Sequence, residues 1–422
     1  MRRALILGLY YPPANFMAGR RLEGWARHLP SFGYEPLVLT RYYDPDERDS
    51  HDVYASSRAT NTLNEPWVES DRVVYTRFQP GVWTRMPLPG KLRGLGHFAW
   101  PDPDHSVWLR QCRNYLRHAG FNPDIVIGSH SPAGILKVAR KLAEAYDVPW
   151  IADFRDLWVR EEWTGFDKSL KLFFQRRHLR SAAGISVVTE GMATTIQAQI
   201  TPLTKVVRPI YNGAEPVQSV SADPRDRAAL EAYRTIARDH QIILTYTGHL
   251  YPGQKPERFL DTVAQFAKQS GKSCAVVLCG AQDRAQYERW PFVHLLGRVR
   301  HSTSLFLQRE STALFYPTWP ATDSVYSGKI FEMALAGRPV LVSFTPSPDL
   351  EELCKQMKSV IVMKDPEQLI KELSALPRAT AQNGDAPAIA TKKYWAGELA
   401  RFMDEILGQD SNSSAEFNQM TG

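Results

Sequence analysis

The fold of this chain is best predicted from residues 327–344, which read SGKIFEMALAGRPVLVSF. The pattern predicts a loop, a short helix and then a buried strand. Gly337 lies where a helix C-cap glycine belongs, and Pro339 follows it because proline cannot continue a helix. The segment therefore predicts one strand–helix unit of an α/β protein.

Charged residues at the start of this predicted helix suggest a ligand site. Ser327 and Gly328 fall where backbone N–H groups without intrahelical partners and the helix dipole favour an anion. Lys329 adds a positive charge, and Glu332 lies one turn further on the same face. A phosphate at the helix start and two sugar hydroxyls on Glu332 would together hold a nucleotide diphosphate. The alternative is an ordinary strand–helix unit with an exposed lysine and glutamate.

Length and composition predict a two-domain globular protein. The chain has 422 residues, of which 43% are hydrophobic and 23% charged, which is typical of soluble domains. The net charge of +6 permits attraction to anionic lipid or to phosphorylated substrates. The four cysteines form no CxxC pair and no His/Cys cluster, so we expect neither a zinc site nor a disulfide framework, and a cytoplasmic location.

The first residues, MRRALILGLYYPP, resemble a signal peptide. The apolar run is short, however, and Pro12-Pro13 ends it without a small-residue cleavage site. We therefore expect a first buried strand here. Because no run of 18 apolar residues occurs, no membrane-spanning helix is expected.

Short apolar runs, separated by helix-length amphipathic segments, recur along the chain. Most are continuous rather than alternating, as in strands buried on both faces of a parallel sheet. Thirteen strands exceed one doubly wound sheet, so we expect two sheets. The predicted strands are Ala4–Leu9, Pro36–Thr40, Val73–Phe78, Asp124–Ser129, Trp150–Phe154, Gly184–Thr189, Lys205–Tyr211, Ile242–Gly248, Cys274–Gly280, Val293–Gly297, Ala313–Pro317, Pro339–Phe344 and Ser359–Met363.

The predicted fold is α/β, with two Rossmann-like domains of doubly wound parallel sheet that face each other across a cleft. The break is expected near 212–240, where a turn signal and a polar segment lie. The domains are predicted at 1–212 and 240–384. A helix at 385–408 is expected to pack back on the first domain, and the polar residues 409–422 are expected to be disordered.

Glycines and cations follow several predicted strands. Gly19 opens a helix that carries Arg20, and its loop would close over a sugar or phosphate or be a plain connection. The loop lacks GxGxxG, so a dinucleotide fingerprint is absent. Gly248 ends another strand, where backbone N–H groups can approach a ligand. Lys255 would reach the same anion as Lys329, or be a solvated lysine.

Polar residues also end two strands of the first half. Arg155 and Asp156 follow the strand at 150–154, and His130 ends the strand before it. Side chains at the carboxyl ends of parallel strands point toward the ligand side of the sheet. The alternatives are a structural Arg–Asp pair and a loop histidine with no ligand.

Two segments, 79–108 and 158–180, mix aromatic with basic residues. Such mixtures suit a membrane surface or a lipid-linked acceptor, and also single-stranded nucleic acid. An ordinary subdomain core with basic edges is the third possibility. Such a core is the commonest outcome for stretches of this kind; a lipid-linked acceptor with peripheral membrane contact stays a hypothesis, and no nucleic-acid partner is expected.

Two Asp-Pro-Asp triplets, at 44–46 and 102–104, have the carboxylates that could hold a metal bridged to a diphosphate. Neither follows a predicted strand, so we expect no metal site. The chain contains no GxxxxGK[ST], HExxH or GxSxG motif, so the common NTPase, zinc-protease and hydrolase classes lack support.

Taken in order, these motifs resemble the family 4 retaining glycosyltransferases of GT-B fold, and most closely the bacterial members that build surface polysaccharides. The resemblance covers about 1–408. Its motifs are YPPANFMAGR, PDPDHSVW, ADFRDLW, TGHLYPGQK and KIFEMALAGRPVL. It implies that the first domain binds the acceptor and the second binds a nucleotide sugar.

The resemblance also implies roles for single residues of the second domain. Lys255 would bind the donor diphosphate, and Glu332 matches the second glutamate of the family's E-x7-E motif, which holds the ribose. The backbone at Arg298 and Val299 matches the segment that reads the base. In the first domain, Gly19 would close on the donor.

Several further positions match the family's sites or depart from them. Asp156 takes the acidic position of the first-domain site, and Arg155 stands where many relatives have histidine. The first glutamate of E-x7-E falls on Ser324, with Asp323 beside it as a partial replacement. His249 stands where the family usually has arginine. Lys255, Lys329 and the helix start are then the main groups expected to stabilise the leaving group.

The predicted function is transfer of a hexosyl group from a nucleotide-diphosphate sugar to a hydroxyl acceptor, with retention at the anomeric carbon. No metal or other cofactor is expected. The partners would be the nucleotide sugar and a saccharide or lipid-linked saccharide at the inner face of the membrane. The alternatives are a nucleotide-sugar 2-epimerase of the same fold and a non-catalytic nucleotide-sugar or polysaccharide binder.

Overall fold

A computed structural model shows two compact units. Unit 1 comprises Met1–Asn212 with Trp395–Gly422, and unit 2 comprises Gly213–Tyr394. The residues that the structure describes are 1–13, 17–43, 65–77, 103–130, 132–159, 163–216, 221–251, 253–254, 256–280, 285–319, 326–376 and 387–408.

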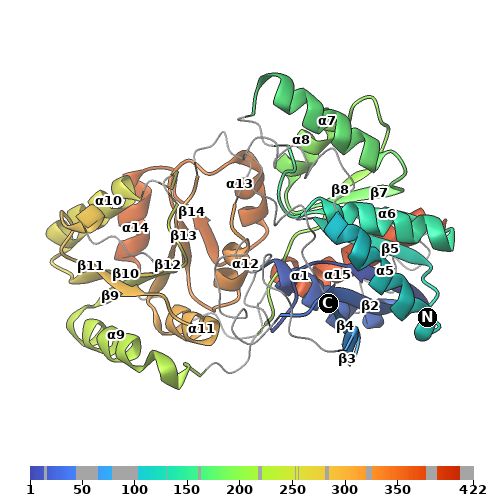
Figure 1. The fold of residues 1–422 in the computed structure, drawn as a ribbon. Helices are drawn as coiled ribbons and strands as arrows, with labels where there is room; N and C mark the ends of the chain where they lie inside the picture. Colours follow the sequence, from blue (N-terminus) through green and yellow to red (C-terminus); the bar gives the residue numbers. More distant parts are fainter. Residues whose placement is uncertain are drawn as a thin grey trace. The chain divides into compact units, whose positions relative to one another are not determined.

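Unit 2 is built on a parallel sheet of six strands (Figure 1). Their order is β11-β10-β9-β12-β13-β14, so the direction of winding reverses between β9 and β12. Ligands of such sheets bind beyond the carboxyl ends of the strands at this reversal. The strands are β9 (Ile242–Thr247), β10 (Cys274–Cys279), β11 (Val293–Gly297), β12 (Ala313–Tyr316), β13 (Val340–Val342) and β14 (Val360–Val362).

Successive side chains along the central strands pack alternately into two separate hydrophobic cores. Leu244 and Val276 join a core with α10 (Glu257–Ser270) and α14 (Pro366–Ser374). Ile243 and Val277 join a second core with α9 (Arg227–Asp239) and α11 (His301–Glu310). Burial on both faces explains why these strands have continuous apolar sequences. The remaining helices of unit 2 are α12 (Lys329–Ala334) and α13 (Pro348–Lys355).

Unit 1 contains an eight-stranded sheet in the order β3-β4-β2-β1-β5-β6-β7-β8. Only β3 is antiparallel to its neighbour, and the winding reverses between β1 and β5. The strands are β1 (Arg2–Leu7), β2 (Tyr34–Arg41), β3 (Trp67–Ser70), β4 (Val73–Thr76), β5 (Ile125–His130), β6 (Trp150–Phe154), β7 (Gly184–Val187) and β8 (Val207–Pro209).

Helices cover the sheet of unit 1, and the last helix of the chain returns to it. A Cβ atom at Gly184 would lie 2.4 Å from the ring of Phe402, so the C-terminal helix packs tightly on β7. Asp404 accepts hydrogen bonds from Tyr34 and Arg2 at 2.6 and 3.3 Å. The helices are α1 (Met17–His28), α5 (Pro103–His118), α6 (Gly134–Tyr146), α7 (Gly165–Leu179), α8 (Glu190–Ile200) and α15 (Lys392–Ile406).

The predicted fold class, two parallel-sheet α/β domains, is confirmed. Each of the thirteen apolar runs overlaps a strand. The sequence missed β3, because this edge strand is mostly exposed and has no apolar run. The predicted tail at 409–422 lies outside the described residues. No helix in the described ranges is long and apolar enough to cross a lipid bilayer.

A buried ion pair ties α1 to the centre of the sheet in unit 1. Asp153, which is fully buried, accepts hydrogen bonds from Arg21 Nη2 at 2.8 Å and Nε at 3.2 Å. The hydroxyls of Ser129 and Ser186 donate to the same carboxylate, each at 2.8 Å. Arg21 also donates to the carbonyl of Ile210 at 2.6 Å. The buried carboxylate of Asp153 is therefore paired by side chains from two neighbouring strands and one helix.

Removing the negative charge of Asp153 should destabilise unit 1 strongly. Asp153→Asn leaves the Arg21 guanidinium buried without a counter-charge, and we expect a loss of about 3–5 kcal/mol in the free energy of unfolding. Glu35→Gln, which removes the exposed pair with Arg3, is the control and should cost less than about 1 kcal/mol. Urea denaturation measures both. Equal losses in the two variants would contradict a special role for the buried pair.

Candidate functional site

The side chain of Lys329 lies across the carboxyl ends of the central strands of unit 2. A Cβ atom added to Gly248, the residue after β9, would lie 2.8 Å from Lys329 Cε. Gly280, the residue after β10, has a φ of +113°, and a Cβ there would lie 2.7 Å from the carbonyl oxygen of Gly248. The positive φ and the backbone contact require glycine at position 280, whereas a Cβ at position 248 would displace the side chains of Lys329 and Tyr246. The two glycines therefore let a lysine approach the backbone at the reversal between β9 and β12.

Glu332 lies one turn beyond Lys329 and is nearly buried, with 10% of its side chain exposed. Its Oε2 is 3.9 Å from Lys329 Nζ, and its Oε1 is 3.8 Å from His301 Nε2. Oε2 is buried and has no hydrogen-bond partner within the described part of the chain. A buried acceptor without a donor is costly. A ligand hydroxyl at Oε2 would remove this cost.

The start of α12 offers fewer open amides than its sequence predicts. The helix has six residues, and its first amides already donate inside unit 2. The amide of Ser327 donates to Tyr316 Oη at 2.9 Å, and the amide of Lys329 to Ser327 Oγ at 3.3 Å. The amide of Phe331 donates to the carbonyl of Gly328 at 3.2 Å. The ammonium of Lys329 is therefore the main group here that can meet an anion.

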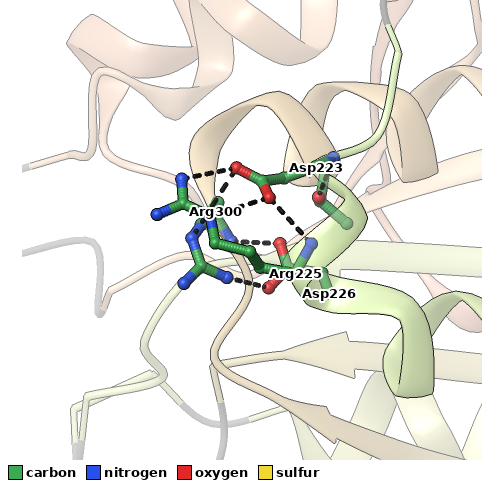
Figure 2. Close-up of polar contacts among 5 residues, drawn as sticks. Asp223, Arg225, Asp226 and Arg300 are labelled. Atoms are coloured by element: carbon green, nitrogen blue, oxygen red, sulfur yellow. Dashed lines mark hydrogen bonds and ion pairs between the residues drawn. The ribbon is translucent and has the colours of Figure 1, made fainter.

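The loop between β11 and α11 is fixed by a cluster of charges (Figure 2). Arg300 donates to Asp226 from Nη1 at 2.7 Å and from its backbone amide at 2.9 Å. Asp223 lies 3.7 Å from Arg300 Nε and is hydrogen-bonded by Arg225, which holds the pKa of Asp223 well below its usual range. Because His301 directly follows Arg300, this cluster helps to fix the position of the His301 imidazole beside Glu332.

The predicted base-reading segment lies just before this cluster. Gly297 has a φ of +67°, Arg298 is exposed and Val299 is half-buried. The structure therefore places Arg298 and Val299 on the loop that leads to His301, the first residue of α11, whose Nε2 lies 3.8 Å from Glu332 Oε1. The sequence alone did not indicate His301, although it lies only two residues beyond Val299.

The loop after Gly248 is anchored to the end of β12. Gln254 is buried, donates from Nε2 to the carbonyl of Pro317 at 3.0 Å and accepts from the amide of Tyr251 at 3.0 Å. The exposed ring of His249 packs edge-on against Tyr251, with centroids 4.8 Å apart. Lys255 follows this loop, but it and Asp323 lie outside the described residues, so their predicted roles stay predictions.

Within the described ranges, no three His, Cys, Asp or Glu side chains are grouped to hold a metal ion. The triplet at 44–46 lies outside those ranges, and so do Asp102 and the side chain of Asp104.

His130 ends β5, at the point where the winding of unit 1 reverses. It is buried, its Nδ1 has no hydrogen-bond partner among the described residues, and its ring lies 5.2 Å from Phe154 and 6.2 Å from Trp158. Burial, and next the positive charge of Arg155, lower the pKa of His130 to about 3. The imidazole is therefore neutral at physiological pH, and its Nδ1 is the atom that could form a hydrogen bond with a ligand.

The other predicted residues of unit 1 lie near the same edge. Arg155 donates from Nε to the carbonyl of His130 at 2.9 Å, whereas Asp156 is exposed and Arg20 half-buried. A Cβ at Gly19 would lie 2.7 Å from Tyr11 Cα, so this glycine permits the preceding loop to pack on α1. Its predicted closure on the donor stays a prediction. The structure thus brings together His130 and Arg155, and it gives Gly19 a packing role.

A comparison with known protein families gives a match to most of unit 1. Residues 18–213 match the glycosyl transferase 4-like domain family. These residues form a glycosyl transferase 4-like domain. No curated protein sequence matches the chain.

Comparison with solved structures covers nearly the whole chain and concerns its fold. The chain is similar to HepE of Anabaena, solved with UDP and glucose, with a TM-score of 0.60 at 15% identity over 97% of this chain and 100% of that chain. Sucrose-phosphate synthase of Thermosynechococcus elongatus gives 0.57 at 13% identity over 100% and 99%. A Listeria monocytogenes protein with a provisional assignment as UDP-N-acetylglucosamine 2-epimerase gives 0.52 at 13% over 97% of both chains. The chain has the GT-B glycosyltransferase fold.

Acid should destabilise the protein partly through His130. Between pH 6.5 and 3 the unfolded chain binds a proton that the buried imidazole does not, so the free energy of unfolding falls by up to about 1.4 kcal/mol per pH unit. His130→Phe keeps an aromatic ring beside Phe154 and removes the titration. Urea unfolding from pH 7.5 to 4.5 should therefore show a shallower decline in the variant. Parallel declines would contradict the assignment of a neutral, buried imidazole.

Proposed function

We propose that this protein is a retaining glycosyltransferase that moves a hexosyl group from a nucleotide-diphosphate sugar to an acceptor hydroxyl. The observation that carries the proposal is the buried, unsatisfied Oε2 of Glu332 beside Lys329, at the strand reversal of unit 2. The glycosyl transferase 4-like domain and the GT-B fold support the same class.

The donor would bind to unit 2. Glu332 would accept hydrogen bonds from the ribose, and the loop at Arg298 and Val299 would meet the base. The Lys329 ammonium would neutralise the charge that grows on the diphosphate as the sugar leaves, which is the costly step. Ser327, Gly328, Gly248 and His249 would line the diphosphate, and Lys255 and Asp323 would complete the site.

The chemistry needs no metal in this proposal, because fixed cations stabilise the leaving group. The acceptor oxygen would attack the anomeric carbon from the face that the diphosphate leaves, and a donor phosphate oxygen would take its proton. The new bond then has the same anomeric configuration as the old one.

The acceptor would bind to unit 1. The neutral Nδ1 of His130 would hydrogen-bond to an acceptor hydroxyl, with Arg155, Asp156, Gly19 and Arg20 at the same edge of the sheet. We further propose a lipid-linked saccharide acceptor of surface polysaccharide or glycolipid assembly, met at the inner face of the membrane. The net charge of +6 supports attraction to such phosphorylated, anionic partners.

A nucleotide-sugar 2-epimerase is the second candidate, favoured by the similarity to the Listeria protein. Incubation with UDP-sugars in the absence of an acceptor separates the two. An epimerase yields a new UDP-sugar, whereas a transferase yields only slow hydrolysis.

Turnover should survive EDTA, and the product should keep the anomeric configuration of the donor. A thermal-shift screen against nucleotide sugars first identifies the donor, since a ligand that binds only the folded state raises its apparent stability. NMR of the product then reads the configuration with and without EDTA. A strict Mn²⁺ requirement, or an inverted product, would overturn the metal-free retaining scheme.

Lys329→Ala should lower kcat by roughly 10²–10³-fold, as loss of a leaving-group stabiliser does. Glu332→Gln should weaken donor binding by roughly 10–100-fold, because hydrogen bonds to a charged acceptor are lost. The exposed pair Glu352 and Lys355 has the same spacing on α13, so Lys355→Ala and Glu352→Gln are matched controls. Wild-type kinetics in both Lys329 and Glu332 variants would remove the proposed site.

A further inference from the structure

The outward face of α7 in unit 1 carries an unusual pair of exposed aromatic side chains. Phe166 and Phe173 are 81% and 57% exposed. They are seven residues apart, and Arg177 lies eleven residues after Phe166, so all three fall on one face of the helix. Arg177 and the C-cap residue Arg180 are exposed as well. The helix therefore presents a stripe that is apolar at one end and cationic at the other.

The cationic end of this stripe opens on a cavity. The cavity has a volume of about 390 Å³ and is lined by Arg140, Arg177, Arg180 and Ser181. It lies where α6, which carries Arg140, packs against α7. Ligand sites commonly measure roughly 300–1,000 Å³, so a phosphate group fits. We name this feature the arginine cavity.

The guanidinium groups of the arginine cavity are only partly neutralised. Arg140 Nη1 lies 3.2 Å from Glu144 Oε1, and Lys141 shares the same carboxylate at 2.8 Å. Arg140 Nε is buried and has no hydrogen-bond partner in the described ranges. Arg177 and Arg180 form no hydrogen bond or ion pair with any described residue. Three arginines thus converge with one carboxylate between them.

The pKa of His178, which lies near the arginine cavity, is lowered by burial and, in part, by the positive charges around it. Burial, followed by the charges of Arg140, Lys137 and Arg177, lowers the pKa of His178. Basic residues in the last turn of a helix also complement its dipole. Dipole complementation accounts for Arg176, which donates to the carbonyl of Gln199 at 2.7 Å. It does not account for Arg140, which belongs to another helix, or for two exposed phenylalanines.

We propose that the outward face of α7 and the arginine cavity bind the surface of an anionic phospholipid membrane. A lipid phosphate would occupy the cavity, where guanidinium groups can form paired, charge-assisted hydrogen bonds. Phe166 and Phe173 would enter the boundary between headgroups and acyl chains. The inference rests on the proposed lipid-linked acceptor for its biological purpose, but its physical basis is the surface alone.

The test is sedimentation of the full chain with vesicles, without donor or acceptor. Wild-type protein should bind to vesicles of phosphatidylcholine with 30% phosphatidylglycerol. It should bind much less to vesicles of phosphatidylcholine alone. Arg177→Ala/Arg180→Ala should weaken partitioning by roughly 25-fold, at about fivefold per cation. Phe166→Ser/Phe173→Ser should also weaken it. The exposed pair Arg234→Ala/Arg238→Ala on α9 removes the same charge and should change partitioning less than twofold.

Several outcomes would overturn the proposal. One is equal loss in the α7 and α9 arginine variants, which would indicate general attraction of a basic protein. Another is a thermal shift by inorganic phosphate that requires Arg177 and Arg180 without vesicle binding, which would indicate a soluble phosphorylated ligand. Binding of a single-stranded oligonucleotide, without vesicle binding, would indicate nucleic acid. Donor-induced thermal shifts should be unchanged in the α7 variants, so failure here is distinguishable from failure of the transferase assignment.

Discussion

The close approach of Lys329 to the backbone at Gly248 is the constraint on which the candidate site depends. A side chain at Gly248 would displace the lysine stem, and one at Gly280 would separate the ends of β9 and β10. With both glycines in place, a cation lies over the strand ends where parallel sheets bind their ligands. Glu332, one turn away, then has Oε2 near that cation, buried and without a hydrogen-bond partner among the described residues.

The two units differ in how the carboxylates near their strand ends are paired. At the strand ends of unit 1, the carboxylate of Asp153 is fully paired by Arg21, Ser129 and Ser186. At the strand ends of unit 2, the carboxylate of Glu332 is left with loose contacts to His301 and Lys329. The first arrangement stabilises a fold, whereas the second is suited to a ligand that supplies the missing donors.

Much of the fold could be predicted from the sequence, because strands buried on both faces must be apolar throughout. Edge strand β3 could not, because Glu69 and Ser70 are exposed and break the pattern. Glu332 and Lys329 were predicted as neighbours from helical spacing. The contact of Glu332 with His301 depends on how α11 packs, and no local pattern encodes it.

Tertiary contacts also decide which polar groups at the strand and helix ends stay open. The amide of Ser327 is consumed by Tyr316 Oη, a hydroxyl eleven residues earlier, so the start of α12 offers fewer donors than its sequence suggests. The buried carboxylate of Asp153 likewise pairs with Arg21, 132 residues away along the chain. Tertiary partners of this kind decide which polar groups remain open to a ligand, and single-sequence spacing does not contain them.

The most direct measurement is a crystal structure of the protein with bound UDP. The account predicts a ribose hydroxyl within hydrogen-bond distance of Glu332 Oε2 and a diphosphate oxygen within about 3 Å of Lys329 Nζ. UDP bound elsewhere on unit 2, with Glu332 and Lys329 in contact only with protein and water, would contradict it.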